Sequence, residues 1–291
     1  MPVYIKVLRP WQWIKNTLIF IPYILGVKNY GADILEVIYT FIIFSLFVSS
    51  TYIFNDIKDI DIDKLHPNKK FRPVASGKID IKNTLYFGCL IFIFTLFGSY
   101  LLNLLTFFYF LIYASLTLLY TIKIKYIFLL DTLIISLMFT LRVLIGGSAS
   151  GVTPTIYLLF SIFFISCILA ISKKISIVNT VGVSSDNMFY QLLIEQNQMN
   201  RFKTLYIIFS FFSIGSLVFW YLDLSENILS IQKQSLLLLS IFGLTILLNY
   251  IYKLSFLGKL EDFSSEIFKN KILLLMSFII GISFLLGYFL I

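Results

Sequence analysis

The chain has 291 residues, of which 59% are hydrophobic, 18% aromatic and 13% charged. An ordinary soluble domain carries about 25% charged residues, so this composition excludes a soluble globular protein and is typical of a polytopic membrane protein. The formal net charge of +8 would suggest nucleic acid as the partner of a soluble protein, but in a membrane protein it has first to be compared with the topology.

Nine apolar stretches have the length of about 20 residues that a helix needs to cross the hydrocarbon core of a bilayer. In chain order they cover residues 12–29, 34–54, 83–103, 105–122, 127–149, 153–172, 203–222, 233–252 and 271–291. The first stretch begins close to Met1, but it lacks a small-residue cleavage site and leads into further stretches, so we interpret it as a retained helix. The sequence therefore predicts an all-α polytopic membrane protein with nine transmembrane helices in a single domain over residues 1–291.

The basic residues are distributed asymmetrically between the two sides of this predicted topology. If the N-terminus lies in the cytoplasm, twenty of the 23 Lys and Arg residues fall on the cytoplasmic side, only Lys28 and Lys233 on the other, and Arg142 within the fifth stretch. This bias follows the positive-inside rule, so the net charge is an orientation signal and no nucleic acid partner is expected. The C-terminus is expected on the opposite side of the membrane. Polar chemistry is expected in the cytoplasm, because that side holds the long polar connections 55–82, 173–202 and 253–270.

The polar segment after the second stretch carries the most informative pattern, Asn55-Asp56-x-x-Asp59-x-x-x-Asp63. If the helix continues past the membrane boundary, the three aspartates at positions i, i+3 and i+7 share one face. Stacked carboxylates repel one another unless cations neutralise them, and Mg²⁺ typically binds one or two carboxylates together with waters and substrate phosphate oxygens. We therefore predict a magnesium–diphosphate site in which the aspartates are catalytic and the metal ligands are Asn55, Asp56, Asp59 and Asp63. The alternative is a solvated face on which Asp and Lys alternate.

This pattern resembles the first aspartate-rich motif of the UbiA-type membrane prenyltransferases, whose fold has nine transmembrane helices and a cytoplasmic cap. Further segments resemble the branch of that family that transfers phosphoribosyl groups to decaprenyl phosphate. They are residues 8–16, 66–77, 120–125 with Asp131, 141–147, and 258–263 with Glu266. The chain departs from the prenyl-transferring members, because the connection after the sixth stretch has Asp186 and Glu195 without the paired spacing of a second aspartate-rich motif. It departs from the phosphoribosyl branch in having Ile177 where a glutamate usually follows the basic pair Lys173-Lys174.

The resemblance implies a Mg²⁺-dependent enzyme that transfers a 5-phosphoribosyl group from phosphoribosyl diphosphate to a polyprenyl (decaprenyl) phosphate, releasing diphosphate, for cell-envelope glycolipid synthesis. It implies a bacterial inner membrane location with a cytoplasmic active site, and the lipid bilayer and both substrates as partners, while a homo-oligomer stays open. A metal ion bound to Asp56, Asp59 and Asp63 would stabilise the charge that develops on the leaving diphosphate. Because the acceptor oxygen is already anionic, no strong general base is needed.

Several further polar residues are candidates for substrate binding. A basic side chain can hold phosphate or can simply be an interfacial orientation charge, and the resemblance favours phosphate binding for Lys15, Arg72 and Lys173. Arg142 is expected to face a polar cavity or a partner, because a charge at mid-membrane costs about 2.5–3.5 kcal/mol, and the alternative is a structural ion pair between helices. His66 is interpreted as a structural or phosphate-contacting residue. The predicted substrate-binding set is Lys15, Asn16, Asn55, Lys69, Lys70, Arg72, Tyr120, Lys123, Asp131, Arg142, Lys173 and Lys174.

Two other functions are compatible with the composition. The first keeps the fold and moves a prenyl group from a prenyl diphosphate to an aromatic or lipid acceptor, but the missing second aspartate-rich motif counts against it. The second is a membrane transporter. Transporters usually place polar features and broken helices near the midplane, whereas the acidic residues here crowd one membrane face.

Overall fold

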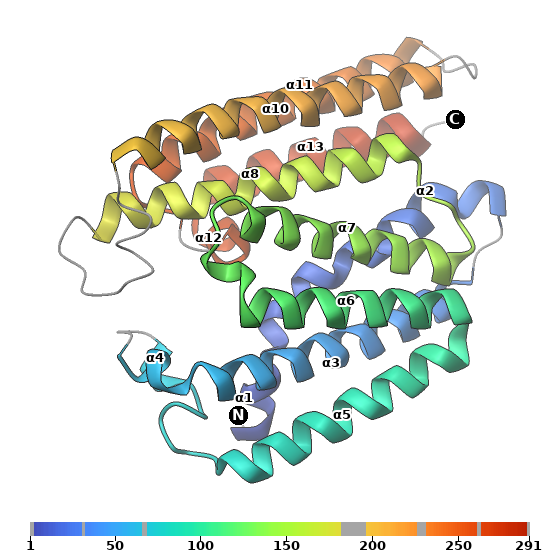
Figure 1. The fold of residues 1–291 in the computed structure, drawn as a ribbon. Coiled ribbons are helices and arrows are strands. Elements are labelled where there is room, and N and C mark those ends of the chain that lie inside the picture. Colours follow the sequence, from blue (N-terminus) through green and yellow to red (C-terminus); the bar gives the residue numbers. More distant parts are fainter. Residues whose placement is uncertain are drawn as a thin grey trace. The chain divides into compact units, whose positions relative to one another are not determined.

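The computed structural model describes residues 3–30, 33–65, 69–181, 196–225, 231–260 and 263–289, and the regular elements within these ranges are all helices (Figure 1). Eight of the described helices are long and apolar enough to cross a membrane. They are α3 (Ile34–Lys58), α5 (Ile81–Leu102), α6 (Leu104–Ile122), α7 (Leu130–Ser150), α8 (Ile156–Val181), α10 (Gln196–Ser225), α11 (Ile231–Phe256) and α13 (Lys271–Phe289). The predicted all-α polytopic fold is confirmed, and each of these helices overlaps one of the predicted stretches.

The predicted first stretch differs from the other eight. After a short helix α1 (Val3–Leu8), the chain forms a 3-10 helix η1 (Pro10–Ile19) that passes directly into α2 (Phe20–Tyr30). Pro10 is the first residue of η1 and Pro22 lies in the first turn of α2, positions at which the missing N–H of proline costs a helix no hydrogen bond. Neither η1 nor α2 alone has the length of a membrane-spanning helix, so the expected count of nine is not confirmed for the described residues.

The chain forms two compact units, one of residues 1–125 with 141–154 and one of residues 126–140 with 155–291. Helix α7 belongs to both, since residues 130–140 lie in the second unit and residues 141–150 in the first.

In the first unit, α3 is the central helix and contacts η1, α1, α5 and α6. Its membrane-spanning part is 61% buried, compared with 22% for α5 and for α6. The core is built from aromatic rings, because Phe44, Phe47 and Phe110 are fully buried and lie 4.8 to 6.1 Å apart between ring centroids. The backbone carbonyl of Ile19 occupies the place that a Cβ atom at Gly146 would take, so η1 and α7 approach one another very closely.

Polar residues begin several of these helices. The side chain of Asp33 accepts a hydrogen bond from the Leu35 N–H at the start of α3, and that of Asp80 accepts one from Asn83 at the start of α5. Asn103 ends α5 and caps α6, since its Oδ1 accepts the Thr106 N–H at 2.7 Å. These contacts satisfy N–H groups that have no partner inside a helix, and they fix where the connections begin.

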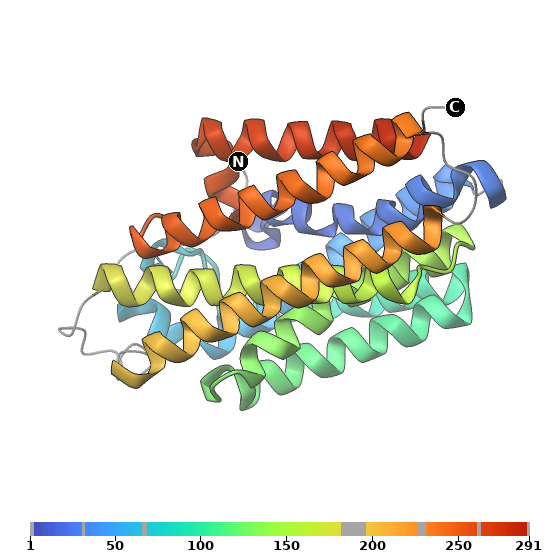
Figure 2. The same cartoon turned by 90° about the horizontal axis from the view of Figure 1, so that it is seen from above.

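In the second unit, α8 packs against α10 and α11, and α11 also packs against α13 (Figure 2). The short helix α12 (Phe263–Lys269) precedes α13. The Tyr206 hydroxyl donates to the Leu248 carbonyl at 2.6 Å and joins α10 to α11. Near the end of α8, Ser176 Oγ accepts the Leu260 N–H at 3.0 Å, so the end of α8 lies beside the connection that follows α11.

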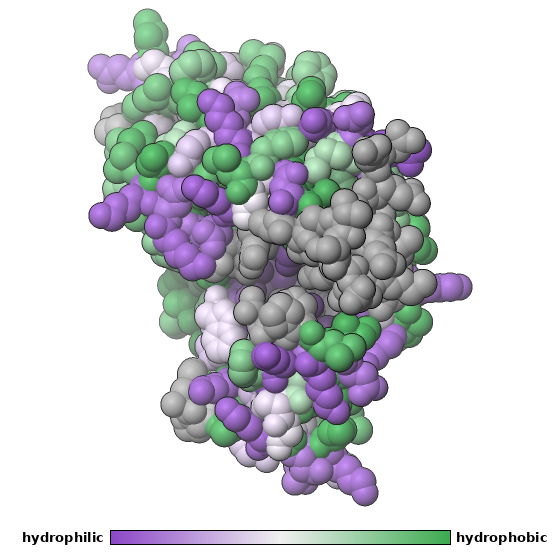
Figure 3. Space-filling view, turned by 90° about the vertical axis from the view of Figure 1, so that its left-hand side faces the viewer, coloured by the Kyte–Doolittle hydropathy of each residue, from purple (hydrophilic) through white to green (hydrophobic). Residues whose placement is uncertain are grey.

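Apolar side chains face outward along the long helices, as expected for surfaces that contact lipid. On α5, for example, Leu90 and Ile93 are each 67% exposed, and on α10 Phe211 is 73% exposed. Figure 3 looks onto the ends of the helices near α4 (Ile60–Leu65) and shows hydrophilic side chains gathered there among apolar ones. In Figure 1, α4 and the described part of the connection from α4 to α5, residues 69–80, lie at this end of the first unit's helices.

Candidate functional site

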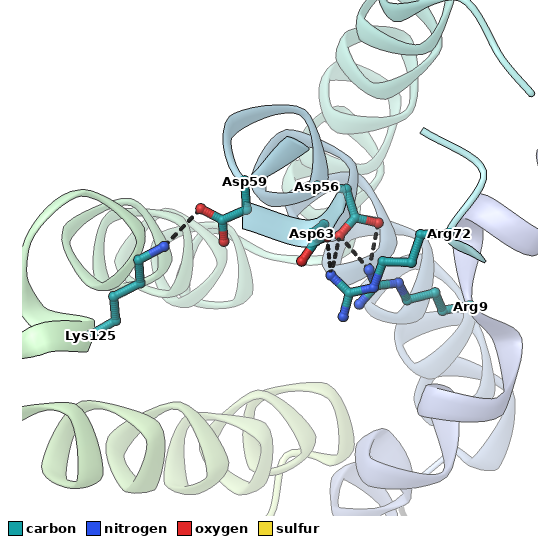
Figure 4. Close-up of polar contacts among 6 residues, drawn as sticks. All are labelled: Arg9, Asp56, Asp59, Asp63, Arg72 and Lys125. Atoms are coloured by element: carbon teal, nitrogen blue, oxygen red, sulfur yellow. Dashed lines mark hydrogen bonds and ion pairs between the residues drawn. The ribbon is translucent and has the colours of Figure 1, made fainter. Parts of the chain in front are cut away.

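The acidic segment, residues 55–63, begins near the end of α3, where the helix is interrupted by one residue. Asp59 is the C-cap of α3, with φ −94° and ψ 13°, and α4 starts at the next residue. The backbone still links the two helices, because the Asp59 N–H donates to the Asn55 carbonyl at 2.9 Å and the Asp63 N–H to the Asp59 carbonyl at 2.8 Å. The predicted uninterrupted helix is therefore not observed, and Asp59 points away from the other two aspartates, toward Lys125 (Figure 4).

Asp56 and Asp63 point toward one another and are 3% and 2% exposed. A single nitrogen of Arg72, Nη1, lies 3.1 Å from Asp56 Oδ1 and 2.6 Å from Asp63 Oδ2. A second guanidinium, that of Arg9, donates through Nη2 to both carboxylate oxygens of Asp56. We call these four residues, Arg9, Asp56, Asp63 and Arg72, the acidic-pair cluster, and their formal charges cancel.

Asp59 belongs to a separate ion pair. Its carboxylate accepts from Lys125 Nζ at 2.7 Å, and the two side chains are 16% and 15% exposed. Nearby, Lys58 Nζ donates to the Thr121 carbonyl at 2.9 Å. Within the first unit, these contacts join the end of α3 to the end of α6 and to the residues just after it. Asn55 is half-buried, and its carbonyl is engaged by the Asp59 N–H.

The donor set of the acidic-pair cluster fits a magnesium ion only in part. Among the described residues, no group of three His, Cys, Asp or Glu side chains is arranged to hold a metal. Magnesium, however, typically needs only one or two protein carboxylates when waters and substrate phosphate oxygens complete its shell. Asp56 and Asp63 supply such a pair, since one cationic nitrogen already bridges them.

Arg9 and Lys125 are site residues that the sequence reasoning missed. Both lie in segments that carry the family resemblance, but as single cations near a predicted membrane boundary they were counted only as orientation charges. Their ion pairs with Asp56 and Asp59 bridge 47 and 66 positions of the sequence, so no local spacing could have revealed them.

The basic connection after α4 brings one of its predicted residues into the cluster. The 3-10 helix η2 (Lys69–Phe71) positions Arg72, whose N–H donates to the Lys69 carbonyl at 2.9 Å. Lys69 is half-buried, whereas Lys70 is exposed and lies over the Phe71 ring at 5.2 Å. His66, with residues 67 and 68, lies outside the described residues.

Arg142 lies in a buried polar network inside the first unit. It is 3% exposed, its Nε donates to Asn16 Oδ1 at 2.9 Å, and its Nη2 donates to the Tyr113 hydroxyl at 3.0 Å. Asn16 in turn donates to Ser45 Oγ at 3.0 Å. The expectation that Arg142 faces polar partners is therefore met by η1 and α6, and the guanidinium also lies over the rings of Phe44 and Tyr113.

The remaining predicted residues are divided between the two units. In the second unit, Lys174 Nζ lies 2.5 Å from Asp131 Oδ1 and 2.8 Å from Thr132 Oγ1, and both charged residues are buried. Its neighbour Lys173 is exposed and Ile177 is half-buried on α8. In the first unit, the half-buried predicted residues are Lys15 and Tyr120, and the exposed one is Lys123.

Comparison with known proteins identifies the family. A family model described as the UbiA prenyltransferase family matches residues 18–189, which is more than half of the chain. The chain belongs to the UbiA prenyltransferase family. Together with its apolar helices, this membership makes it a multi-pass membrane protein.

Relatives with printed activities match only part of the chain. Decaprenyl-phosphate phosphoribosyltransferase of Mycobacterium tuberculosis is 38% identical over 80 residues, which are 26% of this chain and 26% of that protein. The protein of the same name from Mycolicibacterium smegmatis is 40% identical over 80 residues, 26% of this chain and 25% of that protein. An uncharacterized protein of Sinorhizobium fredii, y4nM, is 39% identical over 100 residues, 34% of this chain and 19% of that protein. These matches thus span about a quarter or less of the relatives' lengths.

Solved structures match over nearly the whole chain. A digeranylgeranylglyceryl phosphate synthase superimposes with a TM-score of 0.72 at 20% identity, covering 99% of this chain and 98% of that chain. A UbiA homolog from Archaeoglobus fulgidus, bound to DMAPP and Mg²⁺, superimposes with a TM-score of 0.66 at 16% identity and the same coverage. At these identities the likeness shows the fold.

Proposed function

We propose that this protein transfers a 5-phosphoribosyl group from phosphoribosyl diphosphate to a polyprenyl phosphate and releases diphosphate. The observation that carries the proposal is the buried Asp56–Asp63 pair held by Arg9 and Arg72, since this cluster offers metal ligands and phosphate partners at one place. Partial matches to decaprenyl-phosphate phosphoribosyltransferases support the choice of substrates. The sequence supports it as well, because the connection 173–202 lacks a paired second aspartate-rich motif.

In the proposed reaction, the bond between the ribose C1 and the diphosphate oxygen breaks, and a bond from C1 to an oxygen of the polyprenyl phosphate forms. The carboxylates of Asp56 and Asp63 would hold Mg²⁺, which neutralises negative charge on the departing diphosphate when it is bound. The planar guanidinium of Arg72 can donate two parallel hydrogen bonds to phosphate oxygens, in a geometry that lysine does not match. The acceptor oxygen is anionic near neutral pH, so no side chain has to remove a proton.

The other predicted residues would act around this centre. We propose that Asn55 and Asp59 complete the metal and diphosphate site once the Asp59–Lys125 pair opens. From the sequence pattern, five basic residues are proposed to hold further phosphate oxygens, namely Lys15, Lys69, Lys70, Lys123 and Lys173. The polar groups of Asn16 and Arg142 bond to each other, as do those of Asp131 and Lys174, and we propose a supporting role for these four residues. We keep Tyr120 as a proposed substrate contact.

The proposed location is a bacterial inner membrane, with the N-terminus and the site in the cytoplasm. The support is the distribution of basic residues, together with the observation that three predicted cytoplasmic segments of the first unit meet at one end of its helices. Arg9, Arg72 and Lys125 come from these three segments and all contact aspartates of the same acidic segment.

A second candidate function is prenyl transfer from a prenyl diphosphate to an aromatic or lipid acceptor. Family membership favours it, and one structural neighbour binds DMAPP and Mg²⁺. The acidic-pair cluster would hold either diphosphate in the same way, so substrate choice has to be measured.

The test is an assay of the full chain, purified in detergent, with Mg²⁺ and two substrate pairs. We expect phosphoribosyl diphosphate with polyprenyl phosphate to yield diphosphate and a lipid-linked phosphoribose, detected by mass spectrometry. Turnover of a prenyl diphosphate with an aromatic acceptor, without any lipid-linked phosphoribose, would replace the proposal by prenyl transfer. Solute uptake by proteoliposomes without any covalent product would replace it by transport.

A further inference from the structure

Arg9 contacts the acidic pair from an unusual backbone conformation. Its φ of 52° and ψ of 58° lie in the left-handed region, which is unfavourable for a residue other than glycine. The guanidinium lies over the ring of Tyr52 at 5.3 Å and donates to Asp56, one helical turn further along α3. The Arg9 side chain is only 15% exposed. The surroundings therefore hold this cation against the carboxylate despite a conformational cost.

The charges of the cluster show why such a cation is useful. In the protein alone, Arg9 and Arg72 compensate Asp56 and Asp63. A divalent cation would compensate both carboxylates by itself, so its arrival leaves the cluster with two uncompensated positive charges on the guanidinium groups. A poorly hydrated guanidinium needs an anionic partner, and a diphosphate provides oxygens for both arginines.

We propose that Arg9 is a second diphosphate-binding arginine, which Asp56 holds in place until a divalent cation takes over the carboxylate. The inference rests on the metal and diphosphate part of the proposed function. It adds Arg9 to the diphosphate site and makes the binding of diphosphate by Arg9 depend on the divalent cation. The cation and the diphosphate each bind weakly alone and strongly together. The cation frees the arginines from the carboxylates, and the diphosphate draws the arginines away and so frees the carboxylates for the cation. Arg72 takes part in the same exchange, but it also bridges the two carboxylates, so Arg9 is the cleaner probe.

The experiment measures two affinities of the full chain in detergent, without turnover. Mn²⁺ alone is titrated by electron paramagnetic resonance, and inorganic pyrophosphate is titrated calorimetrically at saturating Mg²⁺. In Arg9→Gln the carboxylate has lost a competing charge-assisted donor, so we expect Mn²⁺ alone to bind about tenfold more tightly. Pyrophosphate should bind about tenfold more weakly in the same variant, because one of its two arginines is missing.

The opposite signs separate this role from a structural one, because a loosened site would weaken both affinities. Lys6→Gln is the matched control: it removes an exposed cation from the same terminal segment, and both affinities should stay at the wild-type value. Unchanged or weaker Mn²⁺ binding by Arg9→Gln, or unchanged pyrophosphate binding, would overturn the inference.

A second variant decides the question if Arg9→Gln does not fold. Arg9→Lys keeps the charge but not the planar fork, so Mn²⁺ affinity should stay within about threefold and pyrophosphate should bind about tenfold more weakly. Wild-type pyrophosphate affinity in Arg9→Lys would then overturn the inference. A wild-type protein that shows these affinities but no phosphoribosyl transfer would refute the proposed reaction and keep the role of Arg9.

Discussion

Asp56→Asn is expected to damage stability and activity together, because Asp56 is both a predicted metal ligand and the carboxylate on which two arginines converge. Removing one partner of a buried ion pair costs about 3–5 kcal/mol when the other charge is left uncompensated. Here the Arg9 and Arg72 side chains keep 15% and 26% exposure, so water recovers part of that energy. Arg72 also retains Asp63, which leaves Arg9 as the principal unpaired charge, and we expect a net cost of about 2 kcal/mol.

The assay is thermal unfolding of the purified protein in detergent, together with product formation. A loss of this size lowers the midpoint by about 4–8 °C in a chain of comparable length. The double variant Asp56→Asn/Arg9→Gln should recover much of the midpoint, since it removes the unpaired cation, but it should stay inactive. Asp61→Asn is the control, because the Asp61 side chain is 99% exposed, and it should match the wild type in both measurements. A wild-type midpoint for Asp56→Asn, or a double variant less stable than the single one, would refute the reasoning.

Three further outcomes are expected. Gly146→Ala should lower the thermal midpoint by the equivalent of about 1–3 kcal/mol, because the new Cβ meets the Ile19 carbonyl. Gly281→Ala is the control, since there is open space around Gly281, and it should keep the wild-type midpoint. Equal midpoints for the two variants would contradict the close approach of η1 and α7. Lys174→Met should destabilise the protein more than Lys174→Met combined with Asp131→Asn, because the single change leaves a buried carboxylate unpaired; the reverse order in thermal unfolding would argue against the pair. Chelation of divalent cations should abolish product formation, and added Mg²⁺ should restore it, so turnover that persists in excess EDTA would remove the metal from the proposal.

Most of the long helices could be predicted from the sequence. The stretch predicted over residues 105–122 is helix α6 (Leu104–Ile122), because a long apolar run with polar ends has few alternatives in a membrane. The first stretch was harder to predict, because its apolar composition resembles that of the other stretches whereas the chain forms a 3-10 helix there, η1, followed by the short helix α2.

The site could be predicted in composition but not in arrangement. The spacing predicts three aspartates on one helix face, whereas in the structure Asp56 and Asp63 share Arg72 and Asp59 pairs with Lys125. The partners Arg9 and Lys125 depend on tertiary contacts that no local pattern contains. For Arg142, too, the need for partners could be predicted but not their identity. The cost of burying its charge indicates that it needs polar partners, and the structure identifies them as Asn16 and Tyr113.

The central claim is that Asp56 and Asp63 hold a divalent cation against the diphosphate of the donor. The most direct test is the magnetic coupling between a bound Mn²⁺ ion and the phosphorus nuclei of the donor. Mn²⁺ bound to the full chain with phosphoribosyl diphosphate is examined for hyperfine coupling to ³¹P nuclei. We predict strong coupling in the wild-type protein and its loss in Asp56→Asn/Asp63→Asn at the same protein and ligand concentrations. Coupling of equal strength in the double variant would place the metal and the diphosphate elsewhere and contradict the account.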